Sequence, residues 1–291
     1  MFLLYINDLP DCLPPCVHCS VYADDLKLYA INNPQGIQPA LNAILDWSSR
    51  WQLEISREKT SVMFIGASHP AGYRFYLGSH ELQVSTKIPD LGVTYTHDLR
   101  FDPYIDKIVN TAHAKSNYIL KAFSTRKMET LYKLFLTYVR PILEYCTPIW
   151  SPSKKLFIDA VENVQKRFTY RIFARNGLFR ISYKERLKRL NTTSLLLRRV
   201  IFDQNLVYKT VTSGVDVNLE ELFTFCNFNG RTRGHQLRLV VEKAHTQQFH
   251  VSFLVRAAKM WNDLPESIVL SSSPTSFNRK LEALLKKRGL H

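Results

Sequence analysis

The chain has 291 residues, a length that predicts roughly two domains and a core large enough to exclude global disorder. Its formal charge of +14 is uneven, because residues 1–100 hold seven Lys and Arg against ten Asp and Glu, so the remainder carries +17. Residues 166–199 alone hold eleven Lys and Arg and a single acid, Glu185. This asymmetry indicates a polyanionic partner, most simply nucleic acid.

Targeting signals are not expected. Asn7 and Asp8 interrupt the apolar start, which lacks a basic region, so the sequence predicts no signal peptide. No run approaches about 18 apolar residues, so no membrane span is predicted. Five cysteines form the sparse, odd-numbered set that is typical of a reducing compartment. We therefore expect an intracellular protein, nuclear or cytoplasmic, that is not secreted.

The first hundred residues predict mixed α and β structure. Residues 17–31 alternate apolar and polar side chains on both sides of an acidic turn, which indicates a hairpin. Residues 38–51 repeat apolar side chains at helical spacing, with Trp47 and Trp51 expected in the core. The remaining predicted elements are a strand at 61–66, a loop at 66–72, a hairpin from 73–77 and 81–85, and a short strand at 91–93.

From Asp102 onward the pattern becomes helical, so the predicted fold class is α+β. Apolar stripes indicate helices at 102–123, 131–138 and 156–173, and a fourth at 183–211 with a break at 191–193. Residues 214–230 are expected to be irregular. A helix at 249–261, a linker at 271–276 and a basic helix at 277–287 complete the chain.

The tetrapeptide Tyr22–Ala23–Asp24–Asp25 is the strongest chemical signal. Adjacent carboxylates in a turn repel each other unless a cation lies between them. Carboxylates of this kind suit Mg²⁺, which takes one or two of them and leaves coordination positions for phosphate. For an Asp-Asp pair alone a solvated acidic turn is the favoured interpretation, and the apolar strands on both sides, together with the segments that follow, reverse that preference toward a metal site.

Nine short motifs occur in one order along almost the whole chain. They are Phe2–Pro10, Tyr22–Asp25, Asp46–Trp47 with Trp51–Leu53, Lys59–Thr60, Asp90–Val93, Val139–Tyr145, Val164–Thr169, Thr232–His235 and Trp261–Pro265. In this order they resemble the reverse transcriptase of non-LTR (LINE-type) retrotransposons. An ordered series is far more specific than any one of its members.

The resemblance implies an RNA-directed DNA polymerase in which two Mg²⁺ ions act on a primer 3′-oxygen and a deoxynucleotide. Asp24 and Asp25 would be catalytic metal ligands of the palm, and Tyr22 would lie beside the primer end. Lys59 would protonate the leaving pyrophosphate, although relatives often carry Asn where this chain has Ser56. Leu91 and Gly92 match the turn that grips the primer backbone.

The resemblance also predicts what lies outside the chain. The family's third palm aspartate, template segment, fingers and endonuclease domain normally precede the Phe2–Pro10 motif, at which this chain starts. Asp8 and Asp11 flank Pro10 in a turn and would not replace the missing carboxylate. We therefore expect the C-terminal part of a truncated polymerase that is inactive alone.

The basic segment after residue 165 is the candidate nucleic-acid contact. Lys166, Arg167, Arg171 and Arg175 can neutralise phosphates, and interleaved aromatic rings can stack on bases. A solvated basic face is the alternative, which the one-sided charge disfavours. We expect Phe168 in the core and Tyr170 exposed.

Three hypotheses follow. The chain is a polymerase fragment with a partial palm (1–100), thumb helices (101–150) and a basic helical C-terminal region (151–291). Alternatively it is a non-catalytic module that binds nucleic acid, or a pseudogene product. The expected partners are RNA and DNA, with no membrane and no small molecule beyond deoxynucleotides.

Overall fold

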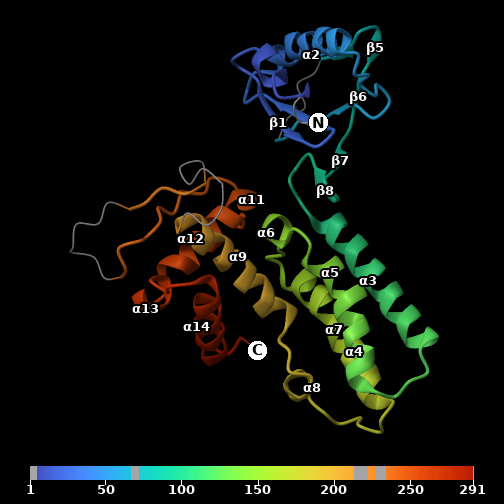
Figure 1. The fold of residues 1–291 in the computed structure, drawn as a ribbon, viewed down its shortest axis with the longest axis vertical. Helices are drawn as coiled ribbons and strands as arrows, with labels where there is room; N and C mark the ends of the chain where they lie inside the picture. The colour runs from blue at the N-terminus through green and yellow to red at the C-terminus, as the bar shows by residue number, and fades with distance from the viewer. Residues whose placement is uncertain (1–4, 67–71, 213–221, 227–233, 291) are drawn as a thin grey trace. The chain divides into compact units, whose positions relative to one another are not determined.

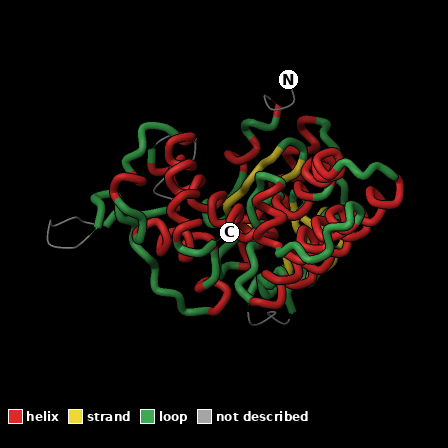
Figure 2. Tube along the Cα trace, turned by 90° about the horizontal axis from the view of Figure 1, so that it is seen from below, coloured by secondary structure: helices red, strands yellow, loops and turns green. Residues whose placement is uncertain are grey.

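The computed structural model of the chain describes residues 5–66, 72–212, 222–226 and 234–290. The chain divides into two compact units, unit 1 (Met1–Leu99) and unit 2 (Arg100–His291). Helices dominate, and the described strands pair only as separate two-stranded sheets (Figure 1, Figure 2). The predicted α+β class is confirmed. The functional division at residues 100 and 150 stays a prediction.

Unit 1 is built from one helix and short strand pairs. Strands β1 and β2, β4 and β5, and β7 and β8 pair antiparallel, whereas β3 and β6 pair parallel. The elements are η1 (Leu9–Cys12), β1 (His18–Tyr22), β2 (Asp25–Tyr29), η2 (Pro34–Gly36), α2 (Ile37–Trp51), β3 (Ser61–Val62), β4 (Tyr76–Leu77), β5 (His80–Glu81), β6 (Gln83–Val84), β7 (Lys87–Asp90) and β8 (Val93–Thr96).

The predicted helix at 38–51 is confirmed as α2, whose apolar stripe forms the core of unit 1. Leu41 is buried against Phe75 and Leu77. Trp47 is also buried, and its Nε1 donates a hydrogen bond to Asp8 Oδ1 at 2.9 Å. Trp51 was expected in the core, but it is 39% exposed because it is the last helical residue.

The strand predictions in unit 1 are confirmed only in part. The strand expected at 61–66 is limited to β3, and the loop expected at 66–72 lies largely outside the described residues. The hairpin expected at 73–85 contracts to β4 and β5, while β6 pairs with β3 instead. These segments are short enough for tertiary packing to override local pattern.

Unit 2 is helical. Its elements are α3 (Asp102–Ala122), α4 (Met128–Tyr138), α5 (Arg140–Glu144), α6 (Thr147–Trp150), α7 (Lys155–Ala174), α8 (Tyr183–Arg189), α9 (Leu195–Val211), α11 (Gln247–His250), α12 (Phe253–Asn262), α13 (Glu266–Val269) and α14 (Pro274–Lys287). The break predicted within 183–211 separates α8 from α9. The helix predicted at 249–261 is divided into α11 and α12, and α14 begins inside the predicted linker. The irregular segment expected at 214–230 lies mostly outside the described residues.

Helices α3 and α7 lie side by side and run in the same direction. Lys154 Nζ donates to Asp102 Oδ2 at 2.6 Å where both helices begin. At their other ends, Arg175 donates to the main-chain carbonyl of Leu120. Phe168 of α7 is buried against Phe135 of α4, with ring centroids 4.8 Å apart. The prediction that Phe168 belongs to the core is confirmed.

The two C-terminal motifs meet in the structure. His235 is buried, and its Nε2 lies 3.0 Å from the carbonyl oxygen of Trp261. Trp261 Nε1 donates to the Leu237 carbonyl at 2.7 Å, and the Asn262 amide bonds both backbone groups of Leu239. These contacts hold 235–239 against the end of α12, so the motifs have a structural role. Thr232 and Arg233 lie outside the described residues.

Candidate active site and nucleic-acid interface

The acidic turn joins β1 to β2 at a two-residue hairpin loop (Figure 1). Tyr22 pairs with Asp25, which leaves Ala23 and Asp24 as the loop. Both carboxylates are exposed, and Tyr22 is 67% exposed. Ala23 has a φ of 53°, a conformation that costs a residue with a side chain about 1–2 kcal/mol. The predicted hairpin is confirmed, and local strain of this kind is concentrated at functional sites.

The hairpin has one inner and one outer face. Directly opposed residues share a face, so Tyr22 and Asp25 lie on the same side as Lys27. Farther along that side, His18 and Tyr29 stack with ring centroids 5.0 Å apart. The alternate residues face the other way, and Leu28 among them packs on the core of unit 1. This alternation presents Asp25 and Lys27 away from that core.

A second hairpin carries the other predicted contact. Asp90 of β7 pairs with Val93 of β8, so Leu91 and Gly92 form a two-residue loop. Their φ values are 45° and 82°, as a hairpin loop with two left-handed residues requires. The expected strand at 91–93 is therefore wrong, because two of its three residues turn the chain. The turn itself is where the primer-gripping segment was predicted.

Lys59 lies in an exposed turn between α2 and β3. The turn is closed by the amide of Thr60, which donates to the carbonyl of Ser56 at 3.2 Å. In the described part of unit 1, no hydrogen bond or ion pair links Lys59 to the acidic turn. Its predicted role in protonating pyrophosphate remains a prediction.

The donor set of the acidic turn fits a magnesium ion. Asp24 and Asp25 supply hard carboxylate oxygens in an exposed loop, which leaves room for the phosphate and water ligands that Mg²⁺ retains. No group of three or more His, Cys, Asp or Glu side chains gathers as a metal site anywhere in the described ranges. The described residues thus supply a pair of carboxylates, and further ligands would come from substrate or from outside them.

The predicted basic residues on α7 differ in what they contact. Arg175 donates to the carbonyls of Leu120 and Phe123, the latter at 2.8 Å, and so caps the C-terminus of α3. Lys166 Nζ lies 5.5 Å from the ring centroid of Tyr183. Arg167 is exposed and makes no hydrogen bond or ion pair with the described residues. Arg171 is also exposed but donates to Asn117 Oδ1 of α3. Arg167 is therefore the best placed of the four for an external phosphate.

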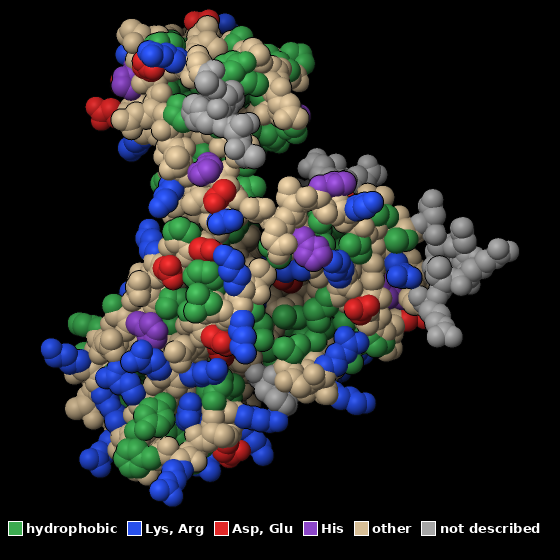
Figure 3. Space-filling model, turned by 180° about the vertical axis from the view of Figure 1, so that it is seen from behind, with side chains coloured by type: hydrophobic (Ala, Val, Ile, Leu, Met, Phe, Trp, Pro, Cys, Tyr) green, Lys and Arg blue, Asp and Glu red, His purple; other side chains and the backbone are tan. Residues whose placement is uncertain are grey.

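Lys and Arg side chains gather at the end of unit 2 that holds the C-terminus of α7 and the loop after α3 (Figure 3). Tyr170, 44% exposed, lies in this region, as predicted, and its ring stacks within 5.8 Å of the Arg186 guanidinium. Burial and the charge of Arg167 both hold the pKa of His113 on α3 below its ordinary value. The positive charge of Arg167 on α7 therefore influences a titratable group on the neighbouring helix α3.

Two motifs that carry the resemblance hold unit 2 together. Glu144 binds the guanidinium of Arg198 through both carboxylate oxygens. Gln165 donates to the Tyr183 hydroxyl at 2.9 Å and to the carbonyl of Thr193 at 3.0 Å. Burial and the adjacent Glu162 carboxylate raise the pKa of Tyr183, which stays protonated and donates to Glu162. Sequence reasoning missed these braces because their partners are far apart in the chain.

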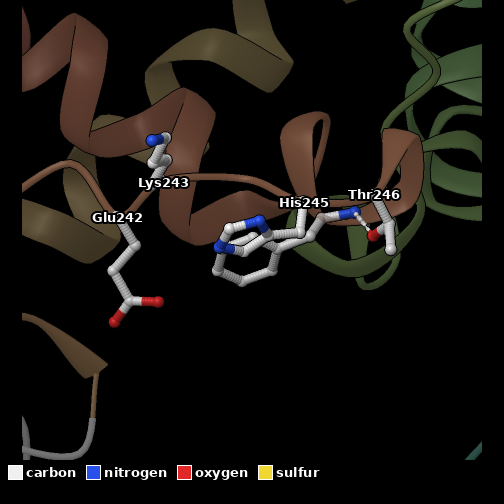
Figure 4. Close-up of a pocket in the computed structure, with 5 residues that line it drawn as sticks. Glu242, Lys243, His245 and Thr246 are labelled. Carbon is white, nitrogen blue, oxygen red and sulfur yellow. Dashed lines mark hydrogen bonds between the residues drawn. The ribbon is translucent and has the colours of Figure 1, made fainter.

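An open cavity of about 570 Å³ lies in the C-terminal part of unit 2 (Figure 4). It is lined by Glu242, Lys243, His245, Thr246 and Phe249, and none of the predicted site residues takes part. The polar side chains that line the cavity come from one short stretch of the chain, and the Thr246 hydroxyl oxygen accepts a hydrogen bond from the Phe249 amide.

Comparison with known proteins supports a polymerase relationship for the first unit. Residues 1–95 match the family described as reverse transcriptase (RNA-dependent DNA polymerase), a span that includes both hairpin loops. An uncharacterized protein of Caenorhabditis elegans is 26% identical over 121 residues, which cover 42% of this chain and 61% of that relative. No solved structure matches the chain. No helix in the described part combines the length and apolar composition of a membrane span.

Proposed function

We propose that the chain is the C-terminal part of a non-LTR retrotransposon reverse transcriptase, with a partial palm followed by thumb and basic C-terminal helices. The observation that carries this is the pair of exposed carboxylates, Asp24 and Asp25, at the β1–β2 turn, inside the span that matches the reverse transcriptase family. The non-LTR type rests on the nine ordered motifs, four of which lie beyond residue 95.

The proposed roles of the palm residues come from the family resemblance. Asp24 and Asp25 would hold Mg²⁺, which when bound stabilises charge on the attacking and leaving oxygens. The exposed ring of Tyr22 would pack under the terminal base pair. The glycine in the Leu91–Gly92 turn lets backbone approach the primer phosphates, because it carries no side chain. Lys59 would donate a proton to pyrophosphate.

The same reasoning predicts that the isolated chain has no polymerase activity. Two-metal nucleotidyl transfer needs ligands for both ions, and the described residues supply one pair of carboxylates. Loss of one ion removes several kcal/mol of charge stabilisation, a rate loss on the order of a thousandfold or more. The purified chain should show no primer extension on RNA or DNA with Mg²⁺ or Mn²⁺. Robust extension that Asp24→Ala abolishes would contradict this part of the proposal.

Photo-crosslinking tests the placement of the primer without requiring catalysis. A primer–template with a 4-thiothymidine at the primer 3′-end should crosslink to peptides spanning 18–30 and 87–96. The same probe placed at the primer 5′-end is the matched control and should label neither peptide. Crosslinks confined to unit 2 would contradict the palm assignment.

A non-catalytic nucleic-acid-binding module is the second candidate. It is favoured by the exposed Arg167 and by the Lys and Arg side chains that gather at this end of unit 2 (Figure 3), which require no metal to act. Salt-dependent binding that survives Asp24→Asn and Asp25→Asn, without any crosslink at 18–30 or 87–96, would select this candidate.

A further inference from the structure

One ion pair connects the two hairpins on which the proposed chemistry depends. Lys27 Nζ binds Asp90 Oδ2, and the same ammonium lies 5.8 Å from the ring centroid of Tyr95. Lys27 belongs to β2, two residues beyond Asp25, whereas Asp90 is the last residue of β7 and Tyr95 belongs to β8. The side chain thus reaches from the first hairpin to both strands of the second.

Both partners lie next to a predicted functional loop. Lys27 and Asp25 share one face of β2, and alternate residues of a strand are about 7 Å apart. Asp90 directly precedes the Leu91–Gly92 loop and closes it by pairing with Val93. The ion pair therefore links a residue two positions after the carboxylate turn to a residue that directly precedes the predicted primer-gripping turn.

Strand pairing among the described residues does not supply this connection. β1–β2 and β7–β8 are separate two-stranded sheets, so no strand ladder runs from one to the other. The base of β7–β8 is attached elsewhere, through the Gly66 amide to the His97 carbonyl at 3.1 Å. A hairpin held at its base can still tilt at its tip, and Lys27 holds the tip.

We propose that Lys27 and Asp90 are a positioning pair that sets the separation between the Asp24–Asp25 turn and the Leu91–Gly92 turn. The proposal rests on the proposed function for its consequence, which is correct placement of a primer end beside the metal carboxylates. Neither residue touches substrate in this scheme. A misplacement of about 1 Å at a reacting centre can cost a hundredfold in rate, so a weak surface pair can carry a large functional effect.

The pair also has a second consequence. Without Asp90, Lys27 would be free to turn toward Asp25 on the same face and compete with a cation there. At roughly 6 Å an ammonium changes a carboxylate's affinity for cations by about threefold or more, even at the dielectric constant of water. Asp90 therefore keeps Lys27 away from the carboxylates as well as holding the hairpin.

The decisive experiment measures the separation of the two turns without metal or nucleic acid. In the full chain with its five native cysteines replaced by serine, spin labels at Tyr22→Cys and Leu91→Cys report the distance distribution by EPR. We expect one narrow peak in the parent protein and at least a twofold broader distribution in Asp90→Asn and Lys27→Gln. The reversed pair Lys27→Asp with Asp90→Lys should restore the narrow peak.

A matched control removes a charge from another exposed ion pair of the same unit. Glu81 lies 3.6 Å from Arg74, so Glu81→Gln should leave the distribution narrow. Distributions equally narrow in the parent, Asp90→Asn and Lys27→Gln would overturn the proposal. Broadening in Glu81→Gln as great as in Asp90→Asn would overturn it too, because the effect would then be general.

Crosslinking of the primer 3′-end distinguishes failure of the Lys27–Asp90 proposal from failure of the proposed function. With the 3′-thiothymidine primer, Asp90→Asn should lower the crosslink yield at 87–96 at least threefold while leaving the affinity for primer–template unchanged. If the parent protein forms no crosslink at either hairpin, the polymerase assignment fails. The EPR distances still decide whether the pair positions the turns.

Discussion

Arg167 lies on α7 and Arg175 directly follows the last residue of that helix, and the structure gives the two arginines different roles. Arg175 satisfies carbonyls at the end of α3, which otherwise lack partners within their helix. Arg167 is exposed and makes no hydrogen bond with the described residues. Substituting each by glutamine removes one charge, so the two variants are matched controls for each other.

The expected stability change follows from the contacts. Arg175 makes hydrogen bonds with a charged donor, worth about 1.5–3 kcal/mol each when buried, and partial exposure reduces that value. We expect Arg175→Gln to lower the free energy of unfolding by about 2–3 kcal/mol. For a unit of this size that is a fall in Tm of about 4–12 °C. Arg167→Gln should change Tm by no more than about 1–2 °C, as is usual for exposed sites.

Binding should show the reverse pattern. One phosphate contact contributes about 0.9 to the slope of log K against log salt for duplex DNA, and about 0.7 for a single strand. Arg167→Gln should lower the slope by about that amount, and Arg175→Gln should leave it unchanged wherever the protein is folded. Arg167→Gln should also raise the pKa of His113, measured by NMR, since it removes one cause of its depression.

The measurements are filter binding or fluorescence anisotropy over a salt series, with thermal unfolding followed by circular dichroism. A normal Tm with a reduced salt slope in Arg175→Gln would refute the assignment of Arg175 as a cap. An Arg167→Gln variant as destabilised as Arg175→Gln would refute the assignment of Arg167 as the external cation.

Three further outcomes are expected. Phe168→Ala should destabilise unit 2 by about 3–5 kcal/mol, because it empties a buried aromatic site, whereas Tyr170→Ala should leave folding intact and weaken single-strand binding by about 1–3 kcal/mol. Asp24→Asn and Asp25→Asn should keep or raise Tm in metal-free buffer, because like-charge repulsion is relieved; a large fall in Tm would indicate a buried structural role. His113 has a lowered pKa, so the unfolded chain takes up its proton first and stability should fall as pH drops below about 6.5, a dependence that should weaken in His113→Gln.

The features that the sequence predicted best are those with a repeating local pattern. The stripes of α2, α3 and α7 and the alternation around Tyr22–Asp25 depend on neighbours within four residues, so pattern suffices to locate them. The break between α8 and α9 was visible in the polar run at 191–193. The adjacent turn carboxylates and the apolar strands beside them indicated a candidate metal site, and the family resemblance then assigned Asp24 and Asp25 as catalytic ligands.

The features that the sequence did not predict depend on distant partners. Lys27 and Asp90 are 63 residues apart, and nothing in either local sequence marks them as a pair. The local pattern at 91–93 predicted a strand, although the resemblance marked Leu91–Gly92 as a turn, because leucine rarely takes a positive φ. Trp51 follows the same helical stripe as Trp47, yet helical spacing does not reveal where the core ends.

The number of basic residues in 166–199 does not by itself tell how many of them can bind phosphate. Of the eleven basic residues in 166–199, at least five are held within the protein, by burial, by hydrogen bonds to main-chain carbonyls or by a carboxylate partner. They are Arg175, Arg186, Arg189, Arg198 and Arg199. The other six, at 166, 167, 171, 180, 184 and 188, set an upper limit for phosphate contacts from this segment, and Arg171 among them already donates to Asn117 Oδ1.

The upper limit of six phosphate contacts can be tested by the salt dependence of binding. Six contacts correspond to a slope of log K against log salt of about −5 for duplex DNA and about −4 for a single strand. If all eleven cations reached phosphates, the duplex slope would approach about −10. The binding constant of a short duplex is measured over a salt series for the parent protein and for Lys166→Gln, Arg167→Gln and Arg171→Gln. The decreases in slope of the three variants, added together, give the contribution of these three residues to phosphate binding. A summed loss near zero, with the slope intact, would place the nucleic acid on another surface of the chain, whatever the charge of residues 166–199.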